Sequence, residues 1–179
     1  MQRLARSRRI RQRILRKLKP RSLNLQMKIF LASDHEGFEL KKKLIVYLQE
    51  LGYATEDCGP YSFNVEDDYP DFVTPCAQEV ASQENSFGII IGKTGEGEAM
   101  CANRVRGIRA GVLYTPNSIK SSTGQNEEII QLMREHNNAN MLSLGAAFLS
   151  EEEARIAVKE FIETPFSNVA RHTRRLAKF

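Results

Sequence analysis

The residues best suited to chemistry lie in a strand–turn–helix stretch in the middle of the chain. Residues 87–91, FGIII, form an apolar run that predicts a strand buried on both faces, and residues 99–105 are compatible with a helix. Three glycines lie between them: Gly92, Gly95 and Gly97. Glycines let backbone N–H groups approach an anion, and a helix N-terminus adds the positive end of its dipole. Glu98 would repel a bare phosphate, so its position beside this cradle favours proton transfer.

Two nucleotide-binding motifs are excluded here. Gly92-Lys93-Thr94 resembles the end of a P-loop, but Phe87 stands where that motif needs a glycine. Gly95-Glu96-Gly97 is followed by Met100 where the dinucleotide pattern needs its third glycine. A turn that simply connects a strand to a helix stays open as the alternative.

Further polar residues follow the first predicted strand, residues 28–32. Asp34 and His35 come directly after it, where open α/β sheets bind ligands. Asp34 is equally suited to cap the N-terminus of the next helix.

The C-terminal third of the chain adds two more polar clusters. His136 and Asn137 follow a helical segment. Arg171 and Arg175 are four residues apart on the last predicted helix, so they share one face and are able to bind a phosphate together. Taken singly, these residues are also compatible with an ordinary solvated surface.

The hydrophobic pattern predicts strands alternating with helices. The expected strands are residues 28–32, 53–59, 87–91, 108–113 and 141–145. The expected helices are residues 38–51, 70–82, 99–105, 129–135, 150–162 and a last one carrying Arg171 and Arg175. Ser150 and Glu153 form a capping-box pattern. This alternation predicts an α/β fold, a three-layer α/β/α Rossmann-like domain with a five-stranded parallel sheet.

Composition points to one domain without a membrane span. The chain has 179 residues, 41% of them hydrophobic, and no apolar run is long enough to cross a bilayer. The cysteines are odd in number and lack metal-ligand spacing: Cys58, Cys76 and Cys101. We therefore expect reduced thiols, a cytoplasmic location and no metal site.

The net charge of +4 averages two unlike segments. Residues 1–26 hold ten Lys and Arg and no acid, which leaves 16 basic and 22 acidic groups, a formal charge of −6, for residues 27–179. We expect residues 1–26 to be a flexible or non-native extension, and residues 27–179 to form the domain. A targeting segment and a basic arm for RNA are the alternatives for the extension.

From Met27 onward the sequence resembles the type B ribose-5-phosphate isomerases, a family shared with the subunits of galactose-6-phosphate isomerase. Six blocks carry the resemblance in one order: ASDHEGFELK (32–41), DCG (57–59), DDYPDF (67–72), GKTGEGEAMCANRVRGIRA (92–110), REHNNAN (134–140) and TPFSNVARHTRR (164–175). The resemblance implies the three-layer fold, an isomerase without metal or cofactor, and a homodimer or homotetramer with active sites across the dimer interface.

The resemblance also implies a catalytic base. Members of the family use either a cysteine just after the third strand or a glutamate beyond the glycine turn. Gly92 occupies the cysteine position and Glu98 the glutamate position, so Glu98 is expected to shuttle a proton between C1 and C2 of an open-chain sugar phosphate. Backbone N–H groups around Gly95 and Gly97 would stabilise the enediolate, and Thr94 would assist proton movement.

The remaining roles implied by the resemblance concern ring opening and binding. His136, with Asp34 nearby, would open the furanose ring, and Asn137 would hold the intermediate. The expected phosphate ligands are His35, Arg171 and Arg175, with one group supplied by the neighbouring subunit. Two further substrate-binding residues are expected, Tyr69 and Asn103.

Three departures from the family limit what the resemblance implies, and the longer 116–134 segment leaves the identity of the substrate open. Ala147 stands where many members have a phosphate-binding arginine, residues 116–134 are longer than usual, and residues 1–26 have no counterpart. The sequence predicts interconversion of ribose 5-phosphate and ribulose 5-phosphate in the pentose phosphate pathway. The alternatives are a six-carbon substrate such as galactose or allose 6-phosphate, and a non-catalytic module that binds a sugar phosphate or RNA.

Overall fold

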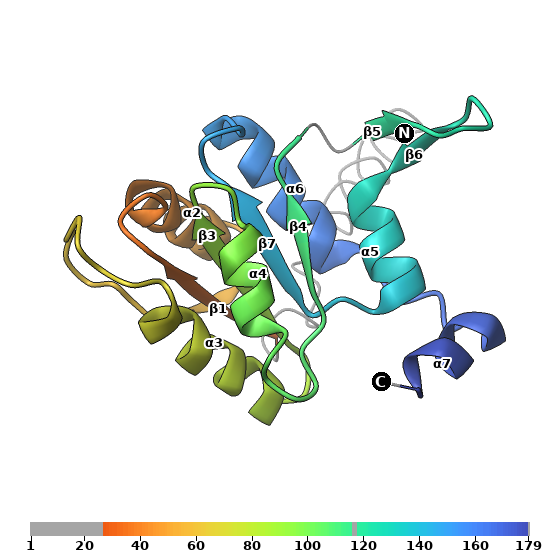
Figure 1. Ribbon diagram of the computed structural model, residues 1–179, viewed down its shortest axis with the longest axis horizontal. Coiled ribbons are helices and arrows are strands. Elements are labelled where there is room, and N and C mark those ends of the chain that lie inside the picture. The colour runs from red at the N-terminus through yellow and green to blue at the C-terminus, as the bar shows by residue number, and fades with distance from the viewer. Residues whose placement is uncertain (1–26, 116–117, 179) are drawn as a thin grey trace, which may run out of the picture.

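A parallel β-sheet forms the centre of the protein. The computed structural model describes residues 27–115 and 118–178. The five strands of the sheet are β1 (Lys28–Ser33), β2 (Ala54–Asp57), β3 (Ser86–Gly92), β4 (Ala110–Leu113) and β7 (Met141–Gly145). They are all parallel and lie in the order β2-β1-β3-β7-β4 (Figure 1). The predicted five-stranded parallel sheet is confirmed.

Helices cover both faces of this sheet. One face packs against α2 (Phe38–Glu50), α5 (Ile129–Asn137) and α6 (Glu151–Glu163), and the other against α3 (Pro70–Ser82) and α4 (Glu96–Ala102). Alternate residues of the strands point to opposite layers: Ile29 and Ile89 belong to the first core, and Phe30 and Ile90 to the second. A sheet buried on both faces explains why its central strands are continuous apolar runs.

The last helix, α7 (Ala170–Leu176), stands apart from the sheet. Figure 1 shows it beside α5, beyond the end of the strands, and the two helices are in contact. The ring centroids of His136 on α5 and His172 on α7 are 4.3 Å apart. The position of α7 is therefore set by α5 rather than by the core.

A hairpin that the sequence did not predict precedes α5. Strands β5 (Ser118–Lys120) and β6 (Asn126–Glu128) pair in antiparallel fashion, outside the main sheet. Residues 121–125 form its turn, with the Ser121 N–H donating to the Gln125 carbonyl at 2.8 Å. This hairpin lies within the longer 116–134 segment.

Element boundaries shift by a few residues from the prediction. The second strand is shorter than expected, and α4 begins at Glu96 rather than Ala99. The capping box is confirmed, because the Ser150 hydroxyl accepts from the Glu153 N–H at 3.2 Å while the Glu153 carboxylate accepts from the Ser150 N–H at 2.8 Å. The proposed extension, residues 1–26, lies outside the described residues.

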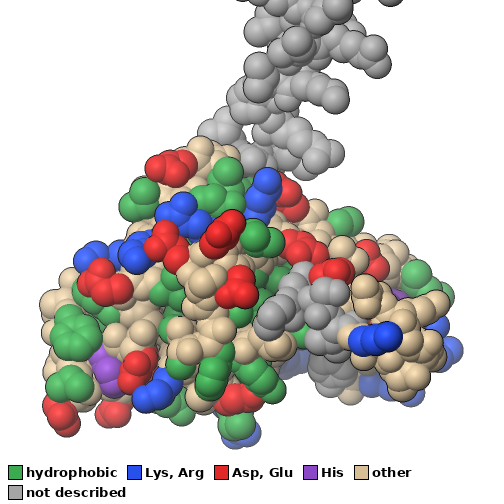
Figure 2. Space-filling view, turned by 90° about the horizontal axis from the view of Figure 1, so that it is seen from above, with side chains coloured by type: hydrophobic (Ala, Val, Ile, Leu, Met, Phe, Trp, Pro, Cys, Tyr) green, Lys and Arg blue, Asp and Glu red, His purple; other side chains and the backbone are tan. Residues whose placement is uncertain are grey.

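Acidic and basic side chains are interspersed over the face of the molecule seen in Figure 2, with hydrophobic groups between them. A nucleic-acid interface is typically a stripe or patch of one sign. Over the described residues of this face the charges of both signs are mixed rather than gathered by sign. In the described part of the chain, no helix has the length and apolarity needed to cross a membrane.

Candidate active site

The carboxyl ends of three neighbouring strands bring one group of the predicted residues together. Ser33 at the end of β1 is in register with Ile91 of β3, and Gly92 at the end of β3 is in register with Gly145 of β7. Asp34 and the glycine turn therefore leave the sheet at the same edge. This is the edge at which open parallel sheets bind their ligands.

Glu98 lies in the first turn of α4 and is buried, with 4% of its surface exposed. Its carboxylate fills the space in which residue 92 would carry a side chain: a Cβ added to Gly92 would lie 1.8 Å from Glu98 Oε1. Burial raises the pKa of Glu98 above its ordinary value, and the nearby charge of Asp34 adds to the rise. A carboxyl group with a raised pKa is suited to accepting a proton and returning it.

The glycine turn is shaped by close packing. Gly95 has φ +79°, which favours glycine, and its carbonyl accepts a 2.6 Å hydrogen bond from the Ser143 hydroxyl of β7. Gly97 faces Tyr69, because a Cβ added there would lie 3.0 Å from the tyrosine hydroxyl. The Thr94 hydroxyl accepts from the Glu96 N–H at 3.3 Å. Thr94 and Tyr69 therefore both lie against the first turn of α4.

Asp34 and His35 complete this group. Asp34 Oδ1 accepts from the N–H groups of Glu36 and Gly37, at 3.0 and 3.2 Å, and burial raises its pKa. Asp34 therefore caps the turn before α2, while α2 itself begins without a side-chain cap. Both functions considered for Asp34, as a cap and as a site residue, are compatible with this geometry.

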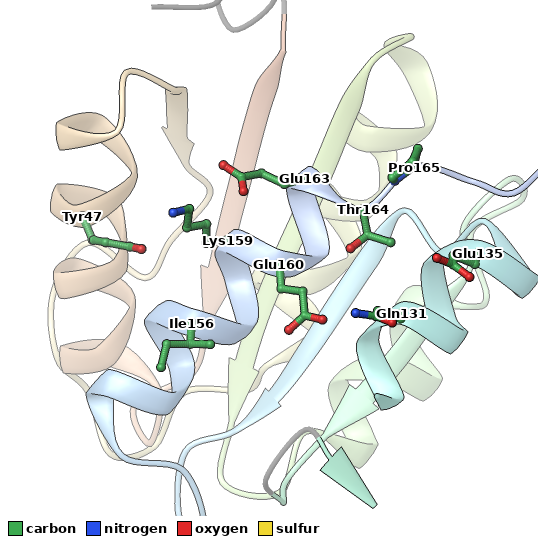
Figure 3. A pocket seen from close by; sticks show the side chains of 9 residues that line it. All are labelled: Tyr47, Gln131, Glu135, Ile156, Lys159, Glu160, Glu163, Thr164 and Pro165. Carbon is green, nitrogen blue, oxygen red and sulfur yellow. The ribbon is translucent and has the colours of Figure 1, made fainter. Parts of the chain in front are cut away.

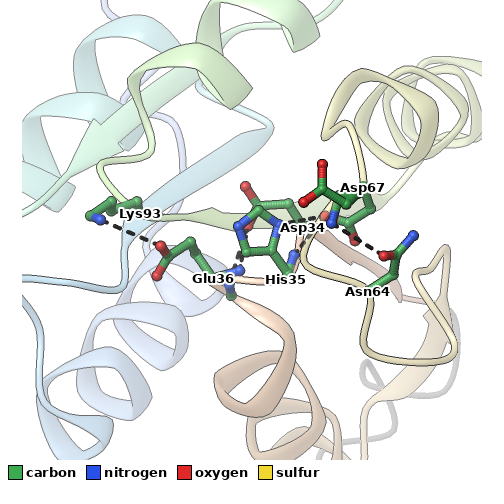
Figure 4. Close-up of polar contacts among 8 residues, drawn as sticks. Asp34, His35, Glu36, Asn64, Asp67 and Lys93 are labelled. Carbon is green, nitrogen blue, oxygen red and sulfur yellow. Dashed lines mark hydrogen bonds and ion pairs between the residues drawn. The ribbon is translucent and has the colours of Figure 1, made fainter.

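Asp67 contacts the candidate site residue His35, a contact that the sequence did not reveal. Its Oδ1 lies 2.6 Å from His35 Nδ1 and also accepts from the His35 N–H at 3.0 Å (Figure 4). This hydrogen bond is the main reason that the pKa of His35 is raised. Thirty-two residues separate the pair, and the sequence signal was limited to the acidic residues of DDYPDF.

A second group of predicted residues lies on α5 and α7. His136 is half-buried against His172, and Arg171 Nε donates to His172 Nε2 at 2.9 Å. His172 Nδ1 lies 3.0 Å from the Ser167 hydroxyl. Burial, together with the charges of His136 and Arg171, lowers the pKa of His172. A neutral His172 thus links His136 to Arg171, a role that no local sequence pattern indicated.

Within one chain, the two groups of residues lie at opposite ends of the strands. The group around Glu98 lies at their carboxyl ends, and the group on α5 and α7 lies at their amino ends. Asn137 ends α5, and the chain then enters β7 at Met141, whereas the Glu98 cradle lies beyond Gly145 at the other end of the same strand. Five residues of strand separate these ends by roughly 13 Å. A single chain therefore does not bring His136 to Glu98.

Asn103 lies with the second group. Its side chain bonds both the N–H and the carbonyl of Ala110 at the start of β4, at 2.8 and 3.0 Å. Together with Asn137 and Met133 it lines a cavity of about 410 Å³. Ala147, by contrast, is exposed beside the glycine turn, where its N–H donates to the Lys93 carbonyl at 3.0 Å.

Another cavity, of about 580 Å³, lies among α2, α5 and α6 (Figure 3). The residues that line it are Tyr47, Gln131, Glu135, Ile156, Lys159, Glu160, Glu163, Thr164 and Pro165. None of the predicted site residues is among them. Its volume is larger than that of the Asn103 cavity, but its lining offers no glycine cradle.

Comparison with known proteins places the chain in a family. The sequence profile described as Ribose/Galactose Isomerase matches residues 29–179. Ribose-5-phosphate isomerase B of Mycolicibacterium paratuberculosis is 37% identical over 150 residues, covering 84% of this chain and 87% of that protein. The probable ribose-5-phosphate isomerase B of Mycoplasma pneumoniae is also 37% identical over 150 residues, covering 84% and 91%.

Solved structures agree with the sequence comparison. Ribose-5-phosphate isomerase B from Mycoplasma genitalium, with bound ribulose-5-phosphate, superposes with a TM-score of 0.75 at 35% identity, covering 85% of this chain and 93% of that one. The enzyme from Thermotoga maritima gives 0.74 at 41% identity, covering 85% and 96%. The six sequence blocks, the fold and these matches lead to one conclusion: the chain belongs to the ribose/galactose isomerase family.

Proposed function

We propose that this protein interconverts ribose 5-phosphate and ribulose 5-phosphate through an enediolate, with Glu98 as the base. The observation that carries the proposal is the buried Glu98 carboxylate, seated beside the glycine turn in the space left by Gly92. The family membership supports the reaction class, and the M. genitalium relative binds ribulose-5-phosphate in its solved structure.

The chemistry follows from the first group of residues. Glu98 removes the proton from C2 of the open-chain aldose, the electron pair forms the C1–C2 double bond, and the carbonyl oxygen at C1 becomes the enediolate oxygen. The same carboxylic acid then returns its proton to C1, and the C2 hydroxyl, on losing its proton, becomes the carbonyl. N–H groups of the Gly95–Gly97 turn stabilise the oxyanion, and the Thr94 hydroxyl carries the proton between O1 and O2.

Ring opening and phosphate binding use both groups. In this proposal His136 donates a proton to the ring oxygen and Asp34 accepts one from the anomeric hydroxyl. Asn137 holds the intermediate, with Tyr69 beside the sugar. The phosphate is bound by His35 of one group and by Arg171 and Arg175 of the other.

The separation of the two groups supports a shared site. His136 and Glu98 lie at opposite edges of one sheet, so a second copy of the chain has to supply one of them. We propose a homodimer, alone or paired into a tetramer, in which α5 and α7 of one subunit cover the glycine turn of the other. Two-fold symmetry then creates two equal sites at one interface.

A six-carbon sugar phosphate is the second candidate. Ala147 is exposed beside the Lys93 carbonyl at the position where many family members carry an arginine, and the β5–β6 hairpin precedes the helix that carries His136. Both features lie where they are able to alter the space for the sugar and its phosphate. Allose 6-phosphate and galactose 6-phosphate therefore belong in the same assay.

The test is ribulose 5-phosphate formation from ribose 5-phosphate by the full chain, with Glu98→Gln and the matched control Glu96→Gln. Glu96 is exposed in the same helical turn. We expect kcat to fall roughly 10²–10⁴-fold in the Glu98 variant and to stay unchanged in the control. Turnover of Glu98→Gln at the wild-type rate would refute the assignment of the base, and turnover of the six-carbon substrates alone would favour the second candidate.

A further inference from the structure

Asp67, in the loop between β2 and α3, makes two contacts to His35. Its Oδ1 accepts from the His35 N–H at 3.0 Å and lies 2.6 Å from His35 Nδ1. The Asp67 side chain is 6% exposed and the His35 side chain 24% exposed. A buried carboxylate thus holds a histidine whose ring still reaches solvent.

The contact determines which ring nitrogen carries the proton. A carboxylate oxygen only accepts hydrogen bonds, so His35 Nδ1 has to donate. Nε2 is then the ring nitrogen through which His35 contacts a ligand. The hydrogen bond from the backbone N–H of His35 to the same Asp67 oxygen, Oδ1, keeps the Asp67 side chain beside His35.

Three carboxylates act on this ring, and one ammonium group pairs with one of them. Asp67 comes from the β2–α3 loop, Asp34 and Glu36 flank His35 in the chain, and Lys93 of the glycine turn lies 3.4 Å from Glu36 (Figure 4). The acidic groups raise the pKa of His35, with the Asp67 hydrogen bond as the largest cause. A protonated ring donates from Nε2 to an anion with a charge-assisted hydrogen bond.

The burial of Asp67 is not explained by stability. Within the described residues, Asp67 Oδ2 is buried and has no hydrogen-bond partner. Burying a carboxylate with one unsatisfied oxygen costs folding free energy, and a buried ion pair such as Asp67–His35 contributes little to the stability of the fold. The compensating interaction is the one with His35.

We propose that Asp67 is a positioning residue, whose carboxylate fixes the orientation and the Nδ1–H tautomer of His35 so that Nε2 is presented to the phosphate of the substrate. This inference rests on the proposed function, because it takes the ligand of His35 to be the phosphate of a sugar phosphate. The Asp67 carboxylate acts only through the imidazole.

The test compares Asp67→Asn with the control Asp71→Asn. Asparagine keeps the shape of the side chain and an oxygen that accepts from the His35 N–H, but it removes the charge. Asp71 is an exposed acid in the first turn of α3, so its variant makes the same charge change without touching His35. Thermal unfolding of both variants checks that the loop remains folded.

The first readout is ¹⁵N NMR of the histidine rings in the ligand-free full chain. The chain has three histidines, so His35→Gln identifies the His35 signals directly. In Asp67→Asn we expect a smaller Nδ1–H population and a lower His35 pKa, with no change in Asp71→Asn. An unchanged tautomer and pKa in Asp67→Asn would overturn the proposal.

The second readout is the KM for ribose 5-phosphate as a function of pH. In Asp67→Asn we expect KM to rise about tenfold, with kcat nearly unchanged, and the rise to begin at a lower pH than in the wild type. In a His35→Gln background, Asp67→Asn should change KM no further. A loss confined to kcat, or an undiminished effect in that background, would overturn the proposal.

The two hypotheses fail separately. If the wild type does not turn over ribose 5-phosphate, the proposed function fails, while the NMR measurement and a titration with inorganic phosphate still test Asp67. If the wild type is active and the Asp67 variant matches it in tautomer, pKa and KM, only the inference about Asp67 fails.

Discussion

Adding one methyl group at position 92 should displace the proposed base. In Gly92→Ala, the new Cβ would lie 1.8 Å from Glu98 Oε1, 2.1 Å from Cδ and 2.6 Å from Oε2. Ordinary contacts begin near 3.4 Å, so the carboxylate has to move by more than about 1 Å. The clash is with the end of a flexible side chain, so we expect the protein to fold and the carboxylate to rotate away.

A displacement of this size lowers the rate by about 100-fold when it separates a base from its proton. We therefore expect kcat for ribulose 5-phosphate formation to fall by about that factor, with a much smaller change in KM. Gly107→Ala is the contrasting control, because a Cβ there meets nothing within 4 Å although φ is +89°. That variant should lose about 1–2 kcal/mol of stability and keep its kcat.

A double variant isolates the cause. If Gly92→Ala acts through Glu98, adding Glu98→Gln should lower kcat no further than Glu98→Gln alone. Full activity in Gly92→Ala, or additive losses in the double variant, would refute the reasoning that the space at residue 92 positions the base.

Three further predictions test the shared site, the buried carboxylate and the buried arginine. Refolding the Glu98→Gln and His136→Ala variants together in equal amounts should recover about a quarter of the wild-type activity. Half of the dimers then contain one subunit of each variant, and each of these dimers has one intact site of two. Continued inactivity would argue against a shared site. The raised pKa of Glu98 means that its contribution to stability is present at acid pH and lost as pH rises through that pKa. The difference in the free energy of unfolding, Glu98→Gln minus wild type, should therefore increase from acid to neutral pH. Urea titrations that give the same difference at every pH would contradict this. Arg134 donates to the carbonyls of Thr164 and Ala139 and stacks 4.6 Å from the centre of the Phe87 ring, so Arg134→Leu should cost about 2–4 kcal/mol in urea unfolding.

The sheet was predictable from the sequence because its central strands carry an unmistakable pattern. Residues 87–91 form a short apolar run and residues 141–145 a mostly apolar one, each followed closely by a glycine or ending in one; their length and these glycines favour buried strands over helices, and both are strands in the structure. The β5–β6 hairpin was not predictable, because Asn126–Glu128 is polar throughout and shows no alternation. The order of the strands in the sheet was not predictable either, since it depends on how the helices that connect the strands cross the sheet.

The candidate site was predictable one residue at a time, but not as an arrangement. Local patterns drew attention to Glu98 and to His136, and the resemblance supplied their roles. The resemblance implied active sites across a dimer interface, but neither source indicated that the sheet separates Glu98 from His136. The pairing of His35 with Asp67 depends on the path of a loop between β2 and α3, and the link from His136 to Arg171 depends on His172 packing between helices.

The separation of the two groups connects the fold to the proposed chemistry. In a parallel sheet the loops at the carboxyl edge all face one way, so they supply the cradle and the base, while α5 delivers His136 to the opposite edge. In the single chain Arg171 and Arg175 are exposed, and Asn137 is exposed at the end of α5. These three exposed polar side chains do not pack in the core, so they are suited to completing a site on another copy of the chain. The proposed activity then requires assembly, so dilution that dissociates the dimer should abolish turnover while each subunit stays folded.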